Sequence, residues 1–178
     1  LLLFQVRKSV FNTKWKDSEI YPPLKDIVLR NINYNVYDEK LITYYSDEEW
    51  EKLDSYMKHD RDLLFTYAGL RQVVDKYLVQ DRSSGQLYES PQYMYMLIAA
   101  TLFKEYPSEN RLQYVKRYYD SVSSFKINIP TPIMAGIRTP LRQFASCVLV
   151  DSDDTLDSIF SSDMAIGRYV AQRAGIGI

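Results

Sequence analysis

The residues best suited to chemistry are a thiol and a hydroxyl that are neighbours in the sequence, Cys147 and Ser146. Cys147 is the only cysteine of the chain and stands at the head of an apolar run that is typical of a strand. A lone cysteine is most often a buried apolar residue. A cysteine nucleophile needs a base, but the only histidine, His59, is distant in the sequence, and redox chemistry needs a second thiol. Cys147 alone therefore supports neither reaction.

Three further patterns allow both a structural and a functional interpretation. Thr131 stands between two prolines that hold the backbone extended, so it belongs to a rigid loop or offers a hydroxyl to an anion at a strand end. The segment Asp154-Thr-Leu-Asp157 is typical of the first turn of a helix, and a ligand contact is the alternative. The segment Gly175-Ile-Gly177 is typical of a helix stop, and it cradles a phosphate only if further chain holds it in place.

Most of the elements that must position these groups have the apolar periodicity of helices. The helices expected from this spacing lie within residues 1–14, 24–32, 46–57, 60–77, 91–106 and 109–124. A capping box starts the third at Ser46, and Asp60 is the expected cap of the fourth. The helix from Pro91 is apolar on most sides and should be central, and residues 79–89 predict a hairpin.

The pattern changes near residue 125. Residues 125–129 alternate as a strand, residues 143–150 predict a second strand, and Asp154 is expected to cap a helix. The fold class is therefore α/β, with a mainly helical first part. Two strands and a helix cannot close a parallel sheet or barrel alone, so the last third indicates an incomplete architecture.

Composition limits the function classes. The 178 residues are 46% hydrophobic and 25% charged, with a formal net charge of -1, which is typical of a soluble globular domain without a nucleic-acid or membrane partner. With one cysteine, no internal disulfide forms, and no metal site is expected. The 16 tyrosines mostly follow helix faces, which favours packing over radical transfer or stacking. Neither end has the pattern of a natural terminus, so we expect a piece of a longer or split polypeptide.

Several long strings resemble the large (alpha, catalytic) subunit of aerobic class I ribonucleoside-diphosphate reductases, in its N-terminal part. These strings are His59-Asp-Arg-Asp62, Lys76-Tyr-Leu-Val-Gln-Asp-Arg82, Arg111-Leu-Gln-Tyr-Val-Lys-Arg117, residues 125–150 and residues 171–178. The resemblance implies a helical domain at 15–124 and the first strands and helix of a ten-stranded α/β barrel at 125–178. Residues 1–14 resemble only the last helix of an ATP-cone domain.

The resemblance also implies roles for named residues. The family reduces ribonucleoside diphosphates by a thiyl-radical mechanism, and Cys147 resembles one half of its redox-active cysteine pair. The implied substrate contacts, mainly to the diphosphate, are Thr131, Ser146, Ala174 and Gly175. The implied contacts to an allosteric specificity effector, ATP or a deoxynucleoside triphosphate with Mg²⁺, are Asp154, Thr155 and Leu156.

The implied partners follow from what the chain lacks. The family's radical-forming cysteine, its catalytic Asn and Glu and the second redox cysteine do not occur here, so the fragment alone should be inactive. The resemblance implies a remaining large-subunit segment, a radical-generating small subunit with a metal cofactor, a large-subunit homodimer, and thioredoxin or glutaredoxin as reductant, in the cytoplasm. The rival interpretation is a non-enzymatic helical interaction module, favoured by the apolar residues between Phe125 and Val150.

Overall fold

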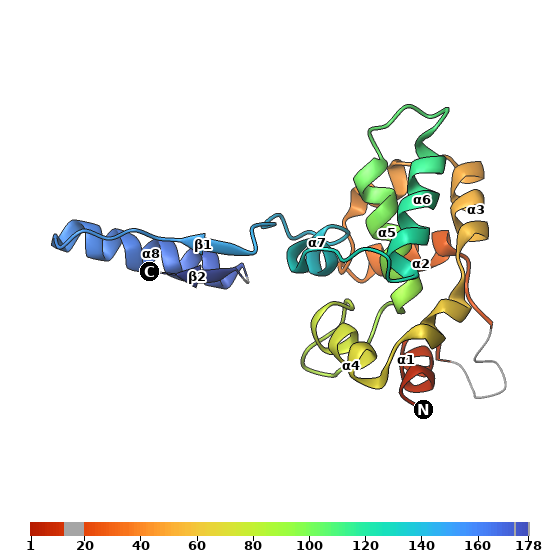
Figure 1. The fold of residues 1–178 in the computed structure, drawn as a ribbon, viewed down its shortest axis with the longest axis horizontal. Helices are drawn as coiled ribbons and strands as arrows, with labels where there is room; N and C mark the ends of the chain where they lie inside the picture. Colours follow the sequence, from red (N-terminus) through yellow and green to blue (C-terminus); the bar gives the residue numbers. More distant parts are fainter. Residues whose placement is uncertain (13–19, 173, 178) are drawn as a thin grey trace.

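The computed structural model describes residues 1–12, 20–172 and 174–177, which form a helical body and a thin arm (Figure 1). The body contains α1 (Leu2–Phe11), α2 (Leu24–Asn33), the 3-10 helix η2 (Glu39–Thr43), α3 (Asp47–Tyr56), the 3-10 helix η3 (His59–Leu64), α4 (Tyr67–Lys76), α5 (Pro91–Phe103), α6 (Arg111–Ser123) and α7 (Thr131–Gly136). The arm contains β1 (Cys147–Leu149), α8 (Leu156–Ala171) and β2 (Gly175–Gly177).

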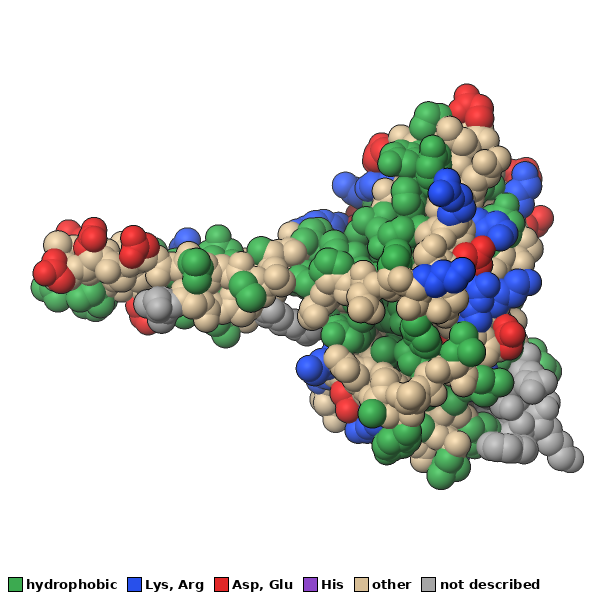
Figure 2. Space-filling model, in the orientation of Figure 1, with side chains coloured by type: hydrophobic (Ala, Val, Ile, Leu, Met, Phe, Trp, Pro, Cys, Tyr) green, Lys and Arg blue, Asp and Glu red, His purple; other side chains and the backbone are tan. Residues whose placement is uncertain are grey.

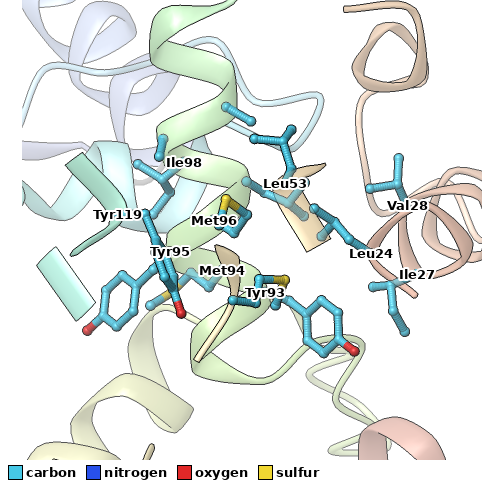
Figure 3. Packing of buried hydrophobic residues seen from close by; sticks show 14 of the residues in the cluster. Leu24, Ile27, Val28, Leu53, Tyr93, Met94, Tyr95, Met96, Ile98 and Tyr119 are labelled. Atoms are coloured by element: carbon cyan, nitrogen blue, oxygen red, sulfur yellow. The ribbon is translucent and has the colours of Figure 1, made fainter. Parts of the chain in front are cut away.

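Helix α5 is the centre of the body, as its sequence predicts. Every residue from Pro91 through Thr101 is buried, because the helix is apolar all round and has neighbours on several sides. Figure 3 shows Met96 and Ile98 of α5 between Leu53 of α3 on one side and Tyr119 of α6 on the other. This packing supplies most of the stability of these short helices, because isolated helices of such length are only marginally stable in water.

Local signals fix two other elements as expected. At the start of α3, the hydroxyl of Ser46 accepts from the amide of Glu49 while the Glu49 carboxylate accepts from the amide of Ser46, which completes the capping box. The hairpin within residues 79–89 forms around an antiparallel bridge between Gln80 and Leu87. Gly85 takes a positive φ of 75° in its turn, a conformation that glycine adopts without steric cost.

The single helix expected from Asp60 to Tyr77 is wrong. The structure has the 3-10 helix η3, an extended Phe65, and then α4, whose first amides are capped by Thr66 accepting from Gly69. A 3-10 segment repeats every three residues, so it breaks the spacing on which the expected buried face depends. Leu63 and Tyr67 are consequently 74% and 72% exposed.

The strand expected at residues 125–129 is also absent from the described chain. Helix α6 ends there with Phe125 at a φ of 59°, and the amides of Phe125 and Lys126 donate back to Val122 and Ser121. Backbone amides used to close a helix are not available for a sheet ladder. The apolar alternation instead places Ile129 against the core of the body.

The arm is one strand–helix–strand unit. β1 and β2 pair in parallel with Cys147 opposite Gly175, and α8 forms the crossover between them. The expected strand at 143–150 is reduced to three residues, and β2 forms where a helix stop or phosphate loop was expected. Thr155, not Asp154, caps α8. The described residues thus show a two-stranded parallel sheet, and the ten-stranded barrel is not shown; the boundaries 1–14, 15–124 and 125–178 stay a prediction.

Candidate functional site

A cavity of about 450 Å³ lies where the arm joins the body. It brings together Thr131 of α7, Ser146 just before β1, and Gln172 just after α8. Its remaining lining residues are Asp75, Lys76, Arg82, Pro132, Ala135, Leu141, Gln143 and Ala145. Two of the predicted substrate contacts, one in α7 and one just before β1, therefore share one cavity.

Thr131 is the first residue of α7, where Pro130 and Pro132 set the helix start. Its Oγ1 lies 3.3 Å from the hydroxyl of Tyr77, which follows the last residue of α4. Tyr77 is only 8% exposed, whereas Thr131 is exposed toward the cavity. The Thr131 side chain thus contacts a buried tyrosine on one side and lines the cavity on the other.

A buried ion pair anchors this corner of the body. Arg138, which follows α7, pairs with Glu89 at the end of the hairpin, and both side chains are fully buried. Its Nη2 also donates to the carbonyl of Tyr77 at 3.0 Å, and its Nη1 donates to the carbonyl of Met134 at 2.6 Å. Burial opposes the charge on Arg138, but the Glu89 carboxylate outweighs that cost and raises the pKa of the guanidinium.

Glu89 in turn organises the other side of the pair. Its Oε1 accepts from the amide of Val79 at 2.8 Å, and its Oε2 accepts from the hydroxyl of Tyr37. Burial and the Glu89 charge raise the pKa of Tyr37, so the phenol stays protonated and remains a donor. Because Arg138, Glu89, Tyr37 and Tyr77 are all buried, this network fixes α7 against α4 and the hairpin.

Cys147 and Gly175 lie side by side as paired residues of β1 and β2. The thiol is free and exposed, so it is accessible to a reaction partner. A Cβ on Gly175 would lie 3.3 Å from the carbonyl oxygen of Ser146 and 3.9 Å from the Cys147 sulfur. Ser146, Cys147, Ala174 and Gly175 therefore form one cluster at the end of the arm nearest the body.

The predicted effector residues lie at the opposite end of the same unit. The loop between β1 and α8 is the tip of the arm (Figure 1), and Asp154 is exposed on it. Thr155 accepts from the amide of Ser158 at 3.3 Å, and Ser158 Oγ accepts from the amide of Asp153 at 2.9 Å. The structure thus separates Asp154, Thr155 and Leu156 from the cavity by the length of α8, and it shows them first of all as a helix start.

The cations of the cavity were missed by the sequence reasoning. Lys76 and Arg82 both line it, although they were part of a string that carried the resemblance without a role. The one carboxylate in the lining, Asp75, pairs with Arg71 at 3.1 Å, and Arg82 donates to the Asp75 carbonyl at 2.6 Å. The cavity therefore has a positive balance of charge that suits an anionic ligand.

His59 gives no base to Cys147. It lies in η3 of the body, stacked on Tyr21 with ring centroids 3.7 Å apart. Burial and the nearby Arg7 charge lower its pKa to about 4. Within the described residues, no cluster of three or more metal-binding side chains occurs, and no helix is long and apolar enough to cross a membrane.

The chain is similar to known proteins over its whole length. Residues 63–142 match the family described as "Ribonucleotide reductase, all-alpha domain". The chain is 50% identical over 179 residues to "Ribonucleoside-diphosphate reductase 1 subunit alpha" of Escherichia coli (strain K12), covering 100% of this chain and 23% of that protein. It is 44% identical over 177 residues to "Ribonucleoside-diphosphate reductase subunit alpha" of Enterobacteria phage T4, covering 99% of this chain and 23% of that protein.

A third relative, the alpha subunit of Haemophilus influenzae, is 50% identical over 179 residues and is likewise covered to 23%. The chain thus spans about a quarter of the length of these curated relatives, 23% in each case. Identity of this degree across nearly the whole chain confirms the resemblance. The chain therefore belongs, over the segment that it covers, to the family of ribonucleotide reductase large subunits.

Proposed function

We propose that this chain forms part of a ribonucleoside-diphosphate reductase large subunit and supplies part of its substrate site. The observation that supports this best is the cavity at the root of the arm, where Thr131 and Ser146 meet two cations beside the exposed thiol of Cys147. Hydroxyls and cations suit a diphosphate, and the neighbouring thiol suits reduction.

In this proposal Cys147 is one half of a redox-active cysteine pair. The two thiols together give up two electrons and two protons and form a disulfide, while the 2′-hydroxyl of the ribose leaves as water and hydrogen takes its place. The second cysteine and the radical-forming cysteine belong to the remaining large-subunit segment. Thioredoxin or glutaredoxin then reduces the disulfide, and the radical comes from the metal cofactor of the small subunit.

The contacts to the substrate diphosphate are Thr131, Ser146 and the backbone of Ala174 and Gly175. The close approach of Gly175 to Ser146 and Cys147 supports this grouping, because a side chain at 175 would crowd the carbonyl of Ser146. We assign Asp154, Thr155 and Leu156 to the allosteric specificity site, which takes a deoxynucleoside triphosphate or ATP with Mg²⁺. Because these residues lie at the arm tip, the proposed effector site and substrate site are at opposite ends of α8.

The proposed partners are the remaining large-subunit segment, the small subunit and a second large subunit, in the cytoplasm. The arm offers them an apolar surface, visible along it in Figure 2. The α8 residues Leu156, Phe160, Met164 and Val170 share one helix face and are 55–71% exposed. Such a face needs a cover, and the fragment alone is inactive in this proposal because it holds one of the required thiols.

The test uses the full-length large subunit reconstituted with its small subunit and thioredoxin. Cys147→Ser should abolish multiple-turnover reduction and leave effector binding intact. Ser146→Ala should weaken substrate binding but leave the turnover rate at saturating substrate unchanged. Full thioredoxin-dependent turnover by Cys147→Ser would reject the redox role. Asp154→Ala should weaken binding of deoxynucleoside triphosphate in equilibrium dialysis, and unchanged binding would reject the effector role.

A second candidate, a non-enzymatic helical interaction module, is favoured by the same uncovered face of α8. The two functions differ in nucleotide affinity. The reductase proposal requires that the full subunit bind nucleoside diphosphates at the cavity, with Thr131→Val weakening that binding. The module proposal requires a partner that covers α8 and no nucleotide affinity at all.

A further inference from the structure

We propose that Tyr77 is a positioning residue that fixes the direction of the Thr131 hydroxyl toward a bound diphosphate. The inference rests on the proposed function, since it concerns the diphosphate site at the root of the arm. It starts from the contact of 3.3 Å between the two hydroxyl oxygens, in which either could be the donor. Tyr77 is not among the residues that line this cavity.

The ligand decides which hydroxyl donates. A threonine hydroxyl has one hydrogen and two lone pairs, and a phosphate oxygen only accepts. To bind the phosphate, Thr131 must direct its single hydrogen into the cavity. Its oxygen is then left as an acceptor, so Tyr77 must donate to it. The pair forms a directed chain that runs from Tyr77 through Thr131 to the phosphate, and polarisation along such a chain strengthens the outer bond.

Tyr77 is built to keep this geometry. Its side chain is 8% exposed, and its carbonyl accepts from Arg138 Nη2 at 3.0 Å. Arg138 also holds the carbonyl of Met134, one turn along the helix that begins at Thr131. One guanidinium therefore binds a carbonyl on each side of the Tyr77–Thr131 contact, and its buried pairing with Glu89 holds it in that position.

Removing the Tyr77 hydroxyl should leave the Thr131 hydroxyl free to rotate, and the phenyl ring that remains should still fill the core. In the full-length subunit, Tyr77→Phe should raise the KM and the equilibrium Kd for a nucleoside diphosphate by about three- to tenfold, the usual range for one hydrogen bond. The kcat should stay within about twofold, because the changed atom does not touch the ribose where bonds change. Tyr45→Phe is the matched control, since it removes another buried tyrosine bond, to the Ala100 carbonyl at 2.8 Å, outside the cavity.

A double-mutant cycle separates positioning from simple destabilisation. Thr131→Val should weaken diphosphate binding, and Tyr77→Phe added to Thr131→Val should weaken it no further, because the chain of bonds is already broken. Thr131→Ser, which keeps the hydroxyl, should restore sensitivity to Tyr77→Phe. Thermal unfolding should show Tyr77→Phe and Tyr45→Phe to be similarly stable.

The outcomes distinguish the inference from the function on which it rests. If Thr131→Val weakens binding and Tyr77→Phe does not, the positioning role is wrong and the diphosphate site stands. If the two substitutions weaken binding additively, Tyr77 acts independently of Thr131 and the inference is again overturned. If Thr131→Val itself leaves diphosphate binding unchanged, the assignment of Thr131 to the substrate site fails.

Discussion

The helical body and the arm bury their apolar residues to very different extents. In the body, α5 is enclosed from Pro91 through Thr101. In the arm, Ser162 is the only buried residue of α8, and Leu149 of β1 is 86% exposed. Both regions have helical or strand geometry, so the difference lies in packing and not in local structure.

This difference indicates that the body supplies the stability of the chain, whereas the candidate reactive groups lie in the arm and at its junction with the body. A helix gains most of its stability from a covered apolar face, so the body can hold itself together while the arm depends on what covers it. The chemical groups follow the opposite distribution. Cys147 and Gly175 lie in the arm, and Thr131 and Lys76 lie at the junction, where an anion can reach them. The body therefore serves as the scaffold that positions one wall of the site.

If the body is the unit that unfolds cooperatively, its buried ion pair should show the largest effect. Arg138→Ala leaves the Glu89 carboxylate buried without its partner, and we expect a loss of about 3–5 kcal/mol in the free energy of unfolding. The control is Arg142→Ala, whose pair with Asp38 has the arginine side chain 57% exposed; we expect about 1 kcal/mol or less there. Urea denaturation measures both losses. Equal losses would contradict the conclusion that the buried Arg138–Glu89 pair stabilises the body more than an exposed pair does.

The same substitution in each region compares them directly. Leu53 is fully buried against α5, and Leu53→Ala should lower the free energy of unfolding by about 2–5 kcal/mol through lost burial and a cavity. Leu149→Ala in β1 should change it by about 0.5 kcal/mol or less, because that side chain is already in solvent. A large effect of Leu149→Ala in the isolated chain would mean that the arm is covered in solution, which would break the comparison.

Two neighbouring groups of η3 should give the body opposing pH dependences. Burial raises the pKa of Asp62 to about 7 from 3.8, so the folded state holds an extra proton and loses stability as the pH rises between these values. Burial and the Arg7 charge lower the pKa of His59 to about 4 from 6.5, so the unfolded state holds the extra proton there and stability rises with pH. The two effects offset each other between about pH 4 and 6.5.

Asp62→Asn should unmask this balance. The variant keeps an oxygen to accept from Gln92, whose amide donates to Asp62 Oδ1 at 2.8 Å. Its stability relative to the unchanged chain should therefore increase as the pH rises from about 4 to about 7, measured by urea denaturation at several pH values. Asp60→Asn, which removes an exposed carboxylate of the same 3-10 helix, is the control for the loss of one negative charge. A constant offset for Asp62→Asn would show that Asp62 stays ionised in the fold.

The sequence predicted those parts of the fold whose signals are local. The capping box at Ser46 and the all-apolar helix from Pro91 are complete within a few turns of chain, and both are confirmed. The strand at 125–129 failed because strand formation needs a partner, and no alternation of side chains reveals whether one exists. β2 was missed for a related reason: its two glycines have low strand propensity, and its pairing with Cys147 spans the whole of α8.

The candidate site was predictable only in part. The resemblance gave Thr131 and Ser146, and the structure brings them into one cavity. Tyr77 and Lys76 belong to a string that carries the resemblance, but nothing in the sequence gave them a role, because a tyrosine and a lysine at the end of a helix are ordinary in any sequence. Only the fold shows that the α4 end meets α7, so their roles depend on tertiary contacts that composition and spacing do not encode.

The smallest expected effects come from two helix caps, one in each region. Ser46→Ala removes the cap of α3 and should lower the free energy of unfolding of the chain by about 1 kcal/mol, since α3 packs within the cooperative body. Thr155→Ala removes the comparable cap of α8, where the hydroxyl accepts from Ser158, and should leave that free energy nearly unchanged. Its effect should appear instead as faster hydrogen exchange of the first amides of α8, because local opening there does not require the body to unfold. If Thr155→Ala lowered global stability as much as Ser46→Ala, the arm and the body would unfold as one unit, and the site at their junction would be as rigid as the core.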